Sequence, residues 1–207
     1  MSIDIFCKNC QKVRMKDVTP DPKQKAIQTA AWETFATYGF RKTSMDDIAR
    51  RAGMSRPAVY LHYRNKEDIF RSLVQYYYDT ACDDVQSALG TAGSATDVLN
   101  RAFAAQMGEN LEAMFVSPHG HELLDAGAQI AMDIKEAGEA RLCALYADWL
   151  EREAAAGRVA YEGSAIKTAE TIGVSLRGIK TSANDFETVK ENMAVLAGLL
   201  GAGLTAA

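Results

Sequence analysis

We predict an all-α fold in which an N-terminal head of three helices precedes a larger helical body, with about nine helices in all. Apolar residues recur at helical spacing over most of the 207 residues. Ser, Asn and Gly stand where these segments are expected to begin and end. Charge is also divided: residues 1–64 hold 12 Lys/Arg and 6 Asp/Glu, a net charge of +6, and residues 65–207 hold 11 and 21, a net charge of −10. This division indicates a basic head on an acidic body.

The composition is ordinary for a globular chain. Apolar residues make up 48% and charged residues 24%, and a chain of this length can bury roughly 70% of its unfolded surface in one or two domains. No apolar run reaches 18 residues and the N-terminus lacks a signal-peptide pattern, so we expect a cytoplasmic protein without a membrane partner. The four cysteines, two close together and two isolated, do not have the pattern of a disulfide framework.

Residues 1–20 are expected to form a flexible basic arm. They either follow a nucleic-acid backbone or minor groove, or form a solvated terminus. Cys7 and Cys10 have the spacing of half a zinc site, but no second Cys pair or nearby His follows. A redox- or metal-sensing arm and unreactive exposed cysteines are both open. The cations of the arm are Lys8, Lys12, Arg14 and Lys16.

Residues 21–66 are expected to form the head, and its first helix is predicted over Lys23–Tyr38. Gly39 ends this helix. Its apolar stripe would form the floor on which the next two helices pack. That stripe consists of Ile27, Ala30, Ala31, Phe35 and Tyr38.

Two short helices joined by a tight turn are predicted within Thr43–Glu67. Ser44 and Asp47 can form a capping box at the start of the first helix. Gly53 ends that helix, because the turn needs a residue that tolerates positive φ. Ser55 can cap the second helix, which carries Pro57 in its first turn, where a missing N–H costs nothing.

The spacing of Ala49, Gly53 and Val59 is that of a helix-turn-helix: a small residue where the helices cross, a turn glycine and a core aliphatic. Short donors and one cation remain on the outer face of the second helix, and such a surface suits the major groove of DNA. Arg56 can bond O6 and N7 of guanine, and Ala58 can meet a thymine methyl. The outer residues are Ser55, Arg56, Ala58, Tyr60 and His62.

The segment YGFRKTSMDDIARRAGMSRPAVYLHYRNKEDIF closely resembles the DNA-binding head of the TetR (tetracycline-repressor) family of bacterial transcriptional regulators. The close match covers residues 23–72, about a quarter of the chain. By this resemblance Thr43, Tyr60, His62 and Lys66 would hold phosphates. The matching positions are Tyr38-Gly39-Phe40, Thr43, Ile48-Ala49, Ala52-Gly53-Met54-Ser55, Tyr60-x-His62-Tyr63 and Lys66-Glu67. The full predicted DNA-binding set is Thr43, Ser44, Ser55, Arg56, Pro57, Ala58, Tyr60, His62 and Lys66.

The resemblance implies a sequence-specific DNA-binding transcriptional regulator. We expect a homodimeric repressor that binds a palindromic operator and is released by a small-molecule ligand. A twofold dimer doubles the contact of a short helix-turn-helix and matches half-sites about 34 Å apart or a multiple of that distance. No cofactor is expected other than the effector.

Residues 67–207 are expected to form the helical regulatory and dimerisation domain. A long helix capped by Asn65 and running to about Leu89 would link this body to the head. The later helices are predicted at Val98–Phe115, His121–Ala126, 128–155, Ala165–Thr181 and Phe186–Leu204.

The last two of these helices mix small residues with large ones, which allows close helix approach. Paired with their copies they would form a four-helix dimer interface, although an intrachain core explains the same pattern. The expected interface residues are Ile172, Leu176, Ile179, Met193, Leu196 and Leu200.

A ligand pocket is predicted among the middle helices of the body. Gln106 and Asn110 lie beside a stripe of Met and aromatic residues and would serve as polar handles, although such a stripe also suits a plain core. The candidate lining is Phe103, Gln106, Met107, Asn110, Met114, Phe115, Met132, Tyr146 and Trp149.

Two other functional classes are considered. A metal- or redox-responsive regulator would use Cys7/Cys10 or His119/His121, with Glu122 and Asp125 near the histidines. A polar turn at a helix start explains the histidines equally, and no metal site is predicted. A DNA-binding protein without a small ligand is a third possibility. Nothing resembles a nucleophile elbow, a phosphate loop or a zincin motif, so no enzyme activity is expected.

Overall fold

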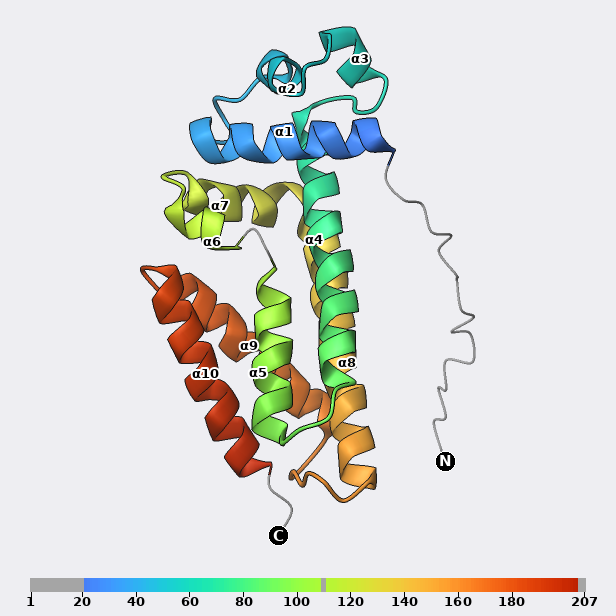
Figure 1. Cartoon of the computed structure of the whole chain (residues 1–207), viewed down its shortest axis with the longest axis vertical. Coiled ribbons are helices and arrows are strands. Elements are labelled where there is room, and N and C mark those ends of the chain that lie inside the picture. Colours follow the sequence, from blue (N-terminus) through green and yellow to red (C-terminus); the bar gives the residue numbers. More distant parts are fainter. Residues whose placement is uncertain (1–20, 109–110, 205–207) are drawn as a thin grey trace, which may run out of the picture.

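The computed structural model describes residues 21–108 and 111–204, and these residues form ten helices and no strand. In Figure 1, α4 runs along the long axis of the molecule, with α1 crossing one end of it and α2 and α3 beyond α1. The helices are α1 Pro22–Tyr38, α2 Met45–Arg51, α3 Arg56–Tyr60, α4 Lys66–Leu89, α5 Ala95–Met107, α6 Leu111–Val116, α7 Gly120–Ile130, α8 Met132–Ala155, α9 Ala165–Ser182 and α10 Phe186–Gly203.

Local hydrogen bonds define the helix-turn-helix as the sequence predicts. Ser44 and Asp47 form the capping box of α2, and Gly53 adopts a φ of +64° in the turn. The Ser55 side chain accepts a hydrogen bond from Ala58 N at the start of α3. The completely buried Val59 packs in one apolar cluster with α1 and α2. The predicted core positions of the motif are therefore confirmed.

Helix α4 joins two separate apolar cores. The side chain of Asn65 caps it, accepting from Asp68 N at 2.7 Å. Its first turns bury Ile69 and Phe70 in the head cluster, and its later turns bury Val85 and Leu89 in the body cluster. The predicted linking helix is confirmed, with the predicted end at Leu89.

Two predicted helices are each interrupted. The chain leaves helical geometry at Gly108, so the predicted helix Val98–Phe115 is divided into α5 and α6. The predicted helix over 128–155 is likewise divided at Ala131, which separates α7 from α8. Apolar spacing continues across both interruptions, which is why the periodicity alone does not reveal them.

The predicted boundary between residues 66 and 67 does not coincide with the packing. Leu123 and Ala126 of α7 are buried in the head cluster, where they join Phe35, Phe40 and Phe70. The three phenylalanine rings contact one another with centroids 5.2–5.7 Å apart. Helix α7 therefore packs with the head, although it lies far along the chain.

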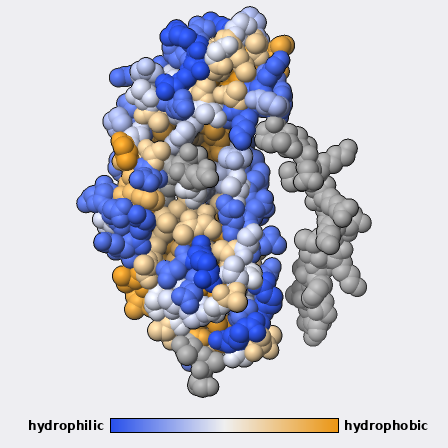
Figure 2. All heavy atoms as spheres, viewed as in Figure 1, coloured by the Kyte–Doolittle hydropathy of each residue, from blue (hydrophilic) through white to orange (hydrophobic). Residues whose placement is uncertain are grey.

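The body core is formed by α4, α5, α8, α9 and α10. Its largest fully buried side chains are Trp149, Tyr146 and Phe103. On the face that Figure 2 shows, hydrophilic residues cover most of the surface, with hydrophobic residues in the central part. No helix in the described ranges is both long and apolar enough to cross a membrane.

Candidate nucleic-acid interface

The tip of the head carries several of the predicted DNA-binding residues on its surface. Ser55, Arg56, Pro57 and Tyr60 are exposed, and Ala58 is half-buried. Helix α3 lies at the end of the molecule, beyond α1 (Figure 1), and because it is only five residues long, most of its residues belong to its first turn. Recognition helices of helix-turn-helix proteins contact bases with their N-terminal residues.

The guanidinium group of Arg56 is held by two neighbours. Its Nη1 lies 3.1 Å from Asp46 Oδ2, and its Nη2 donates to the Tyr60 hydroxyl at 3.3 Å. The group also lies 5.4 Å from the centre of the Tyr60 ring. To read DNA from this arrangement, Arg56 must exchange Asp46 for a base edge. The sequence did not suggest Asp46 as a partner of Arg56.

Thr43 and Lys66 have different positions from those expected of phosphate ligands. The Thr43 side chain is 3% exposed, and its hydroxyl donates to Gly39 O at 2.7 Å. The Lys66 ammonium group donates to the carbonyl oxygens of Phe40 at 2.8 Å, Arg41 at 3.1 Å and Thr43 at 3.0 Å. Both side chains stabilise the segment before α2, so a direct phosphate contact from either does not agree with this geometry.

Two further predicted residues are already engaged within the protein. The Ser44 hydroxyl donates to Asp47 Oδ2 at 2.5 Å. The His62 side chain is only 18% exposed, and its Nδ1 lies 3.7 Å from Asp21 Oδ2. His62 therefore faces the start of α1 rather than the outer face of α3, because the chain turns after Tyr60.

Other exposed residues near the tip were not singled out in the sequence. Three of the four acidic residues in the described part of the head, Glu33, Asp46 and Asp47, each pair with an arginine.

Leu61, at the end of α3, is 85% exposed, and a leucine beside an outward tyrosine was the only sequence signal for it. The remaining exposed cations, without an ion pair to any described residue, are Lys23, Lys25, Arg41 and Lys42.

In the body, the structure brings together part of the predicted ligand set. The Tyr146 hydroxyl donates to Gln106 Oε1 at 2.9 Å, and the Tyr146 ring lies 6.0 Å from that of Phe103. Burial raises the pKa of Tyr146, so its hydroxyl stays protonated. Met107 packs against the cluster that contains Trp149.

Two polar side chains that the sequence analysis did not single out, Tyr77 and Lys180, lie at the end of α5. The Tyr77 hydroxyl donates to Gln106 O at 2.8 Å. Lys180, from the end of α9, donates to the Tyr77 hydroxyl at 3.2 Å and to Gln106 O at 3.3 Å. We call Tyr77, Gln106, Tyr146 and Lys180 the polar cluster. It lies within the apolar body and provides hydroxyl, amide and ammonium groups.

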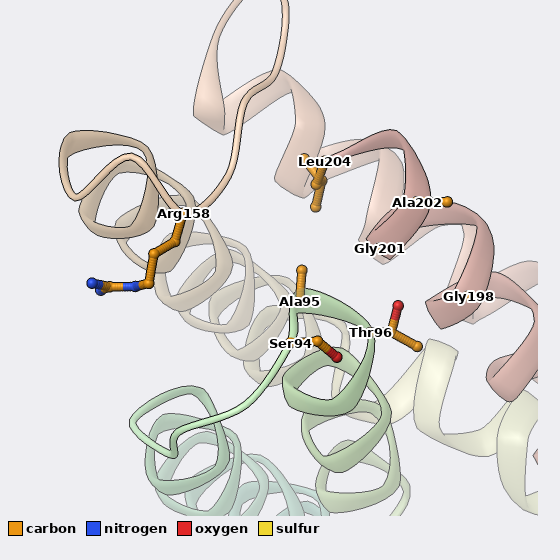
Figure 3. A pocket seen from close by; sticks show the side chains of 8 residues that line it. All are labelled: Ser94, Ala95, Thr96, Arg158, Gly198, Gly201, Ala202 and Leu204. Atoms are coloured by element: carbon orange, nitrogen blue, oxygen red, sulfur yellow. The ribbon is translucent and has the colours of Figure 1, made fainter. Parts of the chain in front are cut away.

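Other members of the predicted ligand set lie elsewhere. Met114 packs against the head cluster, and Met132 is largely exposed at the start of α8. Phe115 packs partly against the body core, and Asn110 lies outside the described residues. A surface cavity of about 320 Å³ lies between the start of α5 and the end of α10, among side chains that include Thr96 (Figure 3). It does not coincide with the predicted lining.

The predicted dimer residues lie mostly on the inward face of their helices. Ile172, Leu176 and Met193 are buried in the body core of the same chain, so they are not available to a second chain. The other three, Ile179, Leu196 and Leu200, are partly buried against the same core. The exposed face instead carries Val174 on α9 and Val195 and Leu199 on α10, each more than 60% exposed.

Of the residues proposed for a metal or thiol site, the structure describes the two histidines. Cys7 and Cys10 lie outside the described residues. His119 Nδ1 lies 3.4 Å from Glu122 Oε2, and His121 is exposed. Within residues 21–108 and 111–204, no group of three or more His, Cys, Asp or Glu side chains is arranged to hold a metal ion. These positions give no support to the metal- or redox-responsive alternative.

Known proteins share this head and this fold. Residues 27–73 match the sequence model described as bacterial regulatory proteins, tetR family. The chain is 30% identical over 142 residues to the HTH-type transcriptional activator FasR of Mycolicibacterium smegmatis, an alignment that covers 64% of this chain and 61% of FasR. The chain therefore matches less than two thirds of the length of that relative.

Two solved structures illustrate the likeness of the fold. A transcriptional regulator from Cytophaga hutchinsonii superposes with a TM-score of 0.69 at 20% identity, covering 89% of this chain and 100% of that one. SmeT, the repressor of the Stenotrophomonas maltophilia multidrug efflux pump SmeDEF, gives a TM-score of 0.67 at 17% identity, covering 92% and 93%. SmeT is also known as a complex with triclosan. At these identities the likeness concerns the fold.

Proposed function

We propose that this chain, which belongs to the TetR family of bacterial regulatory proteins, is a homodimeric transcriptional repressor that binds a palindromic operator and leaves it when a small molecule binds the body. The observation that carries this proposal is the exposed first turn of α3, with Ser55, Arg56 and Tyr60 on the surface of a helix-turn-helix. Donors and a cation on a recognition helix are the groups that read base edges.

The proposed DNA contacts divide into reading and positioning. Arg56 would read a guanine, with Ala58 close enough for a thymine methyl. Tyr60 would bond a phosphate. The exposed cations Lys23 and Lys25 of α1, and Arg41 and Lys42 before α2, would position the head on phosphates. This set replaces Thr43 and Lys66, whose side chains are bonded to backbone carbonyl groups.

The exposed apolar face of α9 and α10 supports a homodimer. Val174, Val195 and Leu199 lie on helices whose opposite faces fill the body core. Gly178 and Gly198 lie on the same helices, and a Cβ at either would meet no other atom within 4 Å. Large exposed aliphatics beside glycines suit a closely packed interface between two copies. A twofold pair would then present two heads to one palindrome.

The polar cluster supports a small-molecule site in the body. The hydroxyl, amide and ammonium groups of this cluster lie beside apolar side chains of the body core, such as Phe103, and would fix the orientation of a ligand that enters among them. SmeT, which shares the fold, is known as a complex with triclosan. A ligand that binds one spacing of the heads better than the other would shift the dimer toward that spacing.

Activation of transcription is a second candidate direction. It is favoured by FasR, which is named as a transcriptional activator and is similar over 142 residues. The two directions share the same operator binding and differ in where the operator lies relative to the promoter. A reporter gene driven by a native promoter region that contains the selected operator separates them, because repression lowers and activation raises its expression.

Selection from a pool of random DNA duplexes tests the proposal. The purified protein should enrich a palindromic sequence, and a mobility shift with that duplex should give a complex of two chains. Raising the salt concentration should lower the affinity for both selected and unselected duplexes, and the affinity for the selected duplex should remain the higher of the two. Enrichment of no sequence, or binding that does not differ between selected and unselected duplexes, would refute a sequence-specific regulator.

A further inference from the structure

Glu122 of α7 reaches the loop that precedes the helix-turn-helix. Its Oε1 accepts a hydrogen bond from Arg41 N at 2.8 Å, across 81 positions of sequence. This bond lowers the pKa of Glu122 below its ordinary value, so the side chain is a carboxylate at neutral pH. A charged acceptor makes the bond stronger than one between neutral groups.

The close approach of α7 depends on Gly39. This residue has a φ of +82°, and a Cβ at its position would collide with Glu122 Oε2 and lie 3.0 Å from His119 Nδ1. Ser117 Oγ donates to Ala36 O at 2.7 Å, so the start of α7 is attached to both sides of the end of α1. These contacts lie beside the buried Leu123.

The same segment is also held by α4. Lys66 donates to the carbonyl groups of Phe40, Arg41 and Thr43, while Glu122 accepts from the N–H group of Arg41. The backbone of this segment is thus bonded both to an ammonium group and to a carboxylate. Since α2 begins at Met45, two residues after this segment, little chain remains to absorb a change in its position.

The far end of α7 is also attached to α4. Arg71 donates to Ile130 O at 2.7 Å and binds Asp133 through two hydrogen bonds of 2.6 and 2.7 Å. Helix α7 is therefore fixed to the head at its start and to the linking helix at its end. In sequence it is flanked by α6 and α8, so it connects the body to the head along a second route besides α4.

We propose that Glu122 is a positioning residue for DNA binding: through the Arg41 N–H it holds the Phe40–Thr43 segment, and so α2 and α3, in the arrangement that fits DNA. The inference rests on the proposed function, since it requires α3 to contact DNA. Without Glu122 the segment would sample other positions. The apparent affinity for DNA would then fall in proportion to the fraction of heads that remain correctly arranged.

Three variants of the full-length protein test this role. Glu122→Ala removes the acceptor, and Glu122→Gln keeps an oxygen acceptor but removes the charge. Asp125→Asn is the matched control, because Asp125 is an exposed carboxylate one turn further along α7. The first measurement is hydrogen exchange of the Arg41 amide and of α2 and α3 in the free protein. The second is affinity for the duplex that the wild type selects.

We expect Glu122→Ala to accelerate exchange at Arg41 and to weaken binding about tenfold, the loss expected for a hydrogen bond to a charged group. Glu122→Gln should recover part of both losses, and Asp125→Asn should behave as wild type. If Glu122→Ala exchanges and binds as Asp125→Asn does, the inference is overturned. Should Glu122→Ala not fold, the comparison between Glu122→Gln and Asp125→Asn decides in the same way.

The exchange measurement separates this inference from the proposed function. If the wild type selects no duplex, the DNA-binding proposal fails, whereas exchange at Arg41 still reports whether Glu122 holds the segment. If the wild type binds DNA and exchange is faster in Glu122→Ala without any loss of affinity, the positioning role alone is refuted.

Discussion

The ammonium group of Lys66 donates a hydrogen bond to Phe40 O at 2.8 Å and lies 4.6 Å from the centre of the Phe40 ring. Phe40 in turn packs against Phe35 and Phe70 in the head cluster. This cation is thus part of the structure that supports the helix-turn-helix. A lysine at the start of a helix beside DNA also suits a phosphate, and the two roles make different predictions.

Lys66→Met should lower stability and leave the salt dependence of DNA binding unchanged. Loss of hydrogen bonds from a charged donor costs about 2 kcal/mol, which corresponds to a fall in Tm of roughly 4–8 °C for a chain of this size. Thermal unfolding measures the first effect. The slope of log affinity against log salt measures the second.

Lys42→Met is the matched control for Lys66, because Lys42 is exposed in the same segment. It should leave Tm unchanged and lower the salt slope by about 2, because each of the two heads of the proposed dimer loses one phosphate contact. A reduced slope in Lys66→Met with an unchanged Tm would instead assign Lys66 to the phosphate.

Arg56→Ala should weaken binding by about 1–3 kcal/mol per half-site and relax the preference at one base pair in each half-site, because each head loses one bidentate contact to guanine. Competition between the selected duplex and duplexes changed at single positions measures this. The control is Arg64→Ala, whose side chain is 89% exposed and pairs with Asp68. A uniform loss over all duplexes for Arg56→Ala would mean that it contacts only the backbone.

Asp46→Asn should strengthen DNA binding by about three- to tenfold. The change releases Arg56 from its ion pair and removes a negative charge that faces the phosphates. Fluorescence anisotropy at low salt is a suitable measurement. Glu33→Gln should have a smaller effect. This change alters a carboxylate of α1 that is paired with Arg51 of α2. If both changes strengthen binding equally, the effect comes from the net charge of the head and not from the release of Arg56.

Leu199→Lys should shift the protein from dimer to monomer, since a charge would enter the apolar face that Leu199 shares with Val195. Sedimentation velocity at several concentrations measures the change. Val116→Lys is the control, because Val116 is also a largely exposed aliphatic residue but belongs to α6. Leu176→Lys, on the inward face of α9, should unfold the chain instead. A dimer that survives Leu199→Lys would place the interface elsewhere.

Asp133 should contribute to acid sensitivity. Its hydrogen bonds to Arg71 lower its pKa from the ordinary value of 3.8 to about 2. A carboxyl group with a depressed folded-state pKa stabilises the fold above its unfolded pKa, and this stabilisation is lost as the pH falls from about 4 toward 2. Wild type should therefore exceed Asp133→Asn in Tm at pH 6, and the difference should narrow as the pH approaches 3. A difference that does not change with pH would contradict this.

The sequence is sufficient for features that depend on neighbours along the chain. Ser44, Ser55 and Asn65 cap the helices that they were expected to cap, because each side chain bonds an amide three residues away. Gly53 occupies the turn at positive φ, which also depends only on the residue type at that position. Arg56 is exposed because it stands at the first position of α3, directly after the cap Ser55.

Contacts between residues far apart in the sequence were not anticipated. Thr43 and Lys66 suit a phosphate by residue type, but carbonyl groups more than twenty residues from Lys66 bind its side chain. Ile172 and Met193 were assigned to the dimer interface, whereas they fill the core of their own chain. Apolar spacing shows that a helix has an apolar face, but it does not show which partner covers that face.

The sequence alone determined the helix-turn-helix, its caps and the family resemblance, because each depends on residue types at short fixed spacings. Only the tertiary structure decided that α7 packs with the head, that Glu122 and Lys66 hold the same segment, and which faces of α9 and α10 remain exposed. The physical reason is that packing joins surfaces across many positions of sequence. Several partners offer similar burial for one apolar face, and the whole chain selects among them.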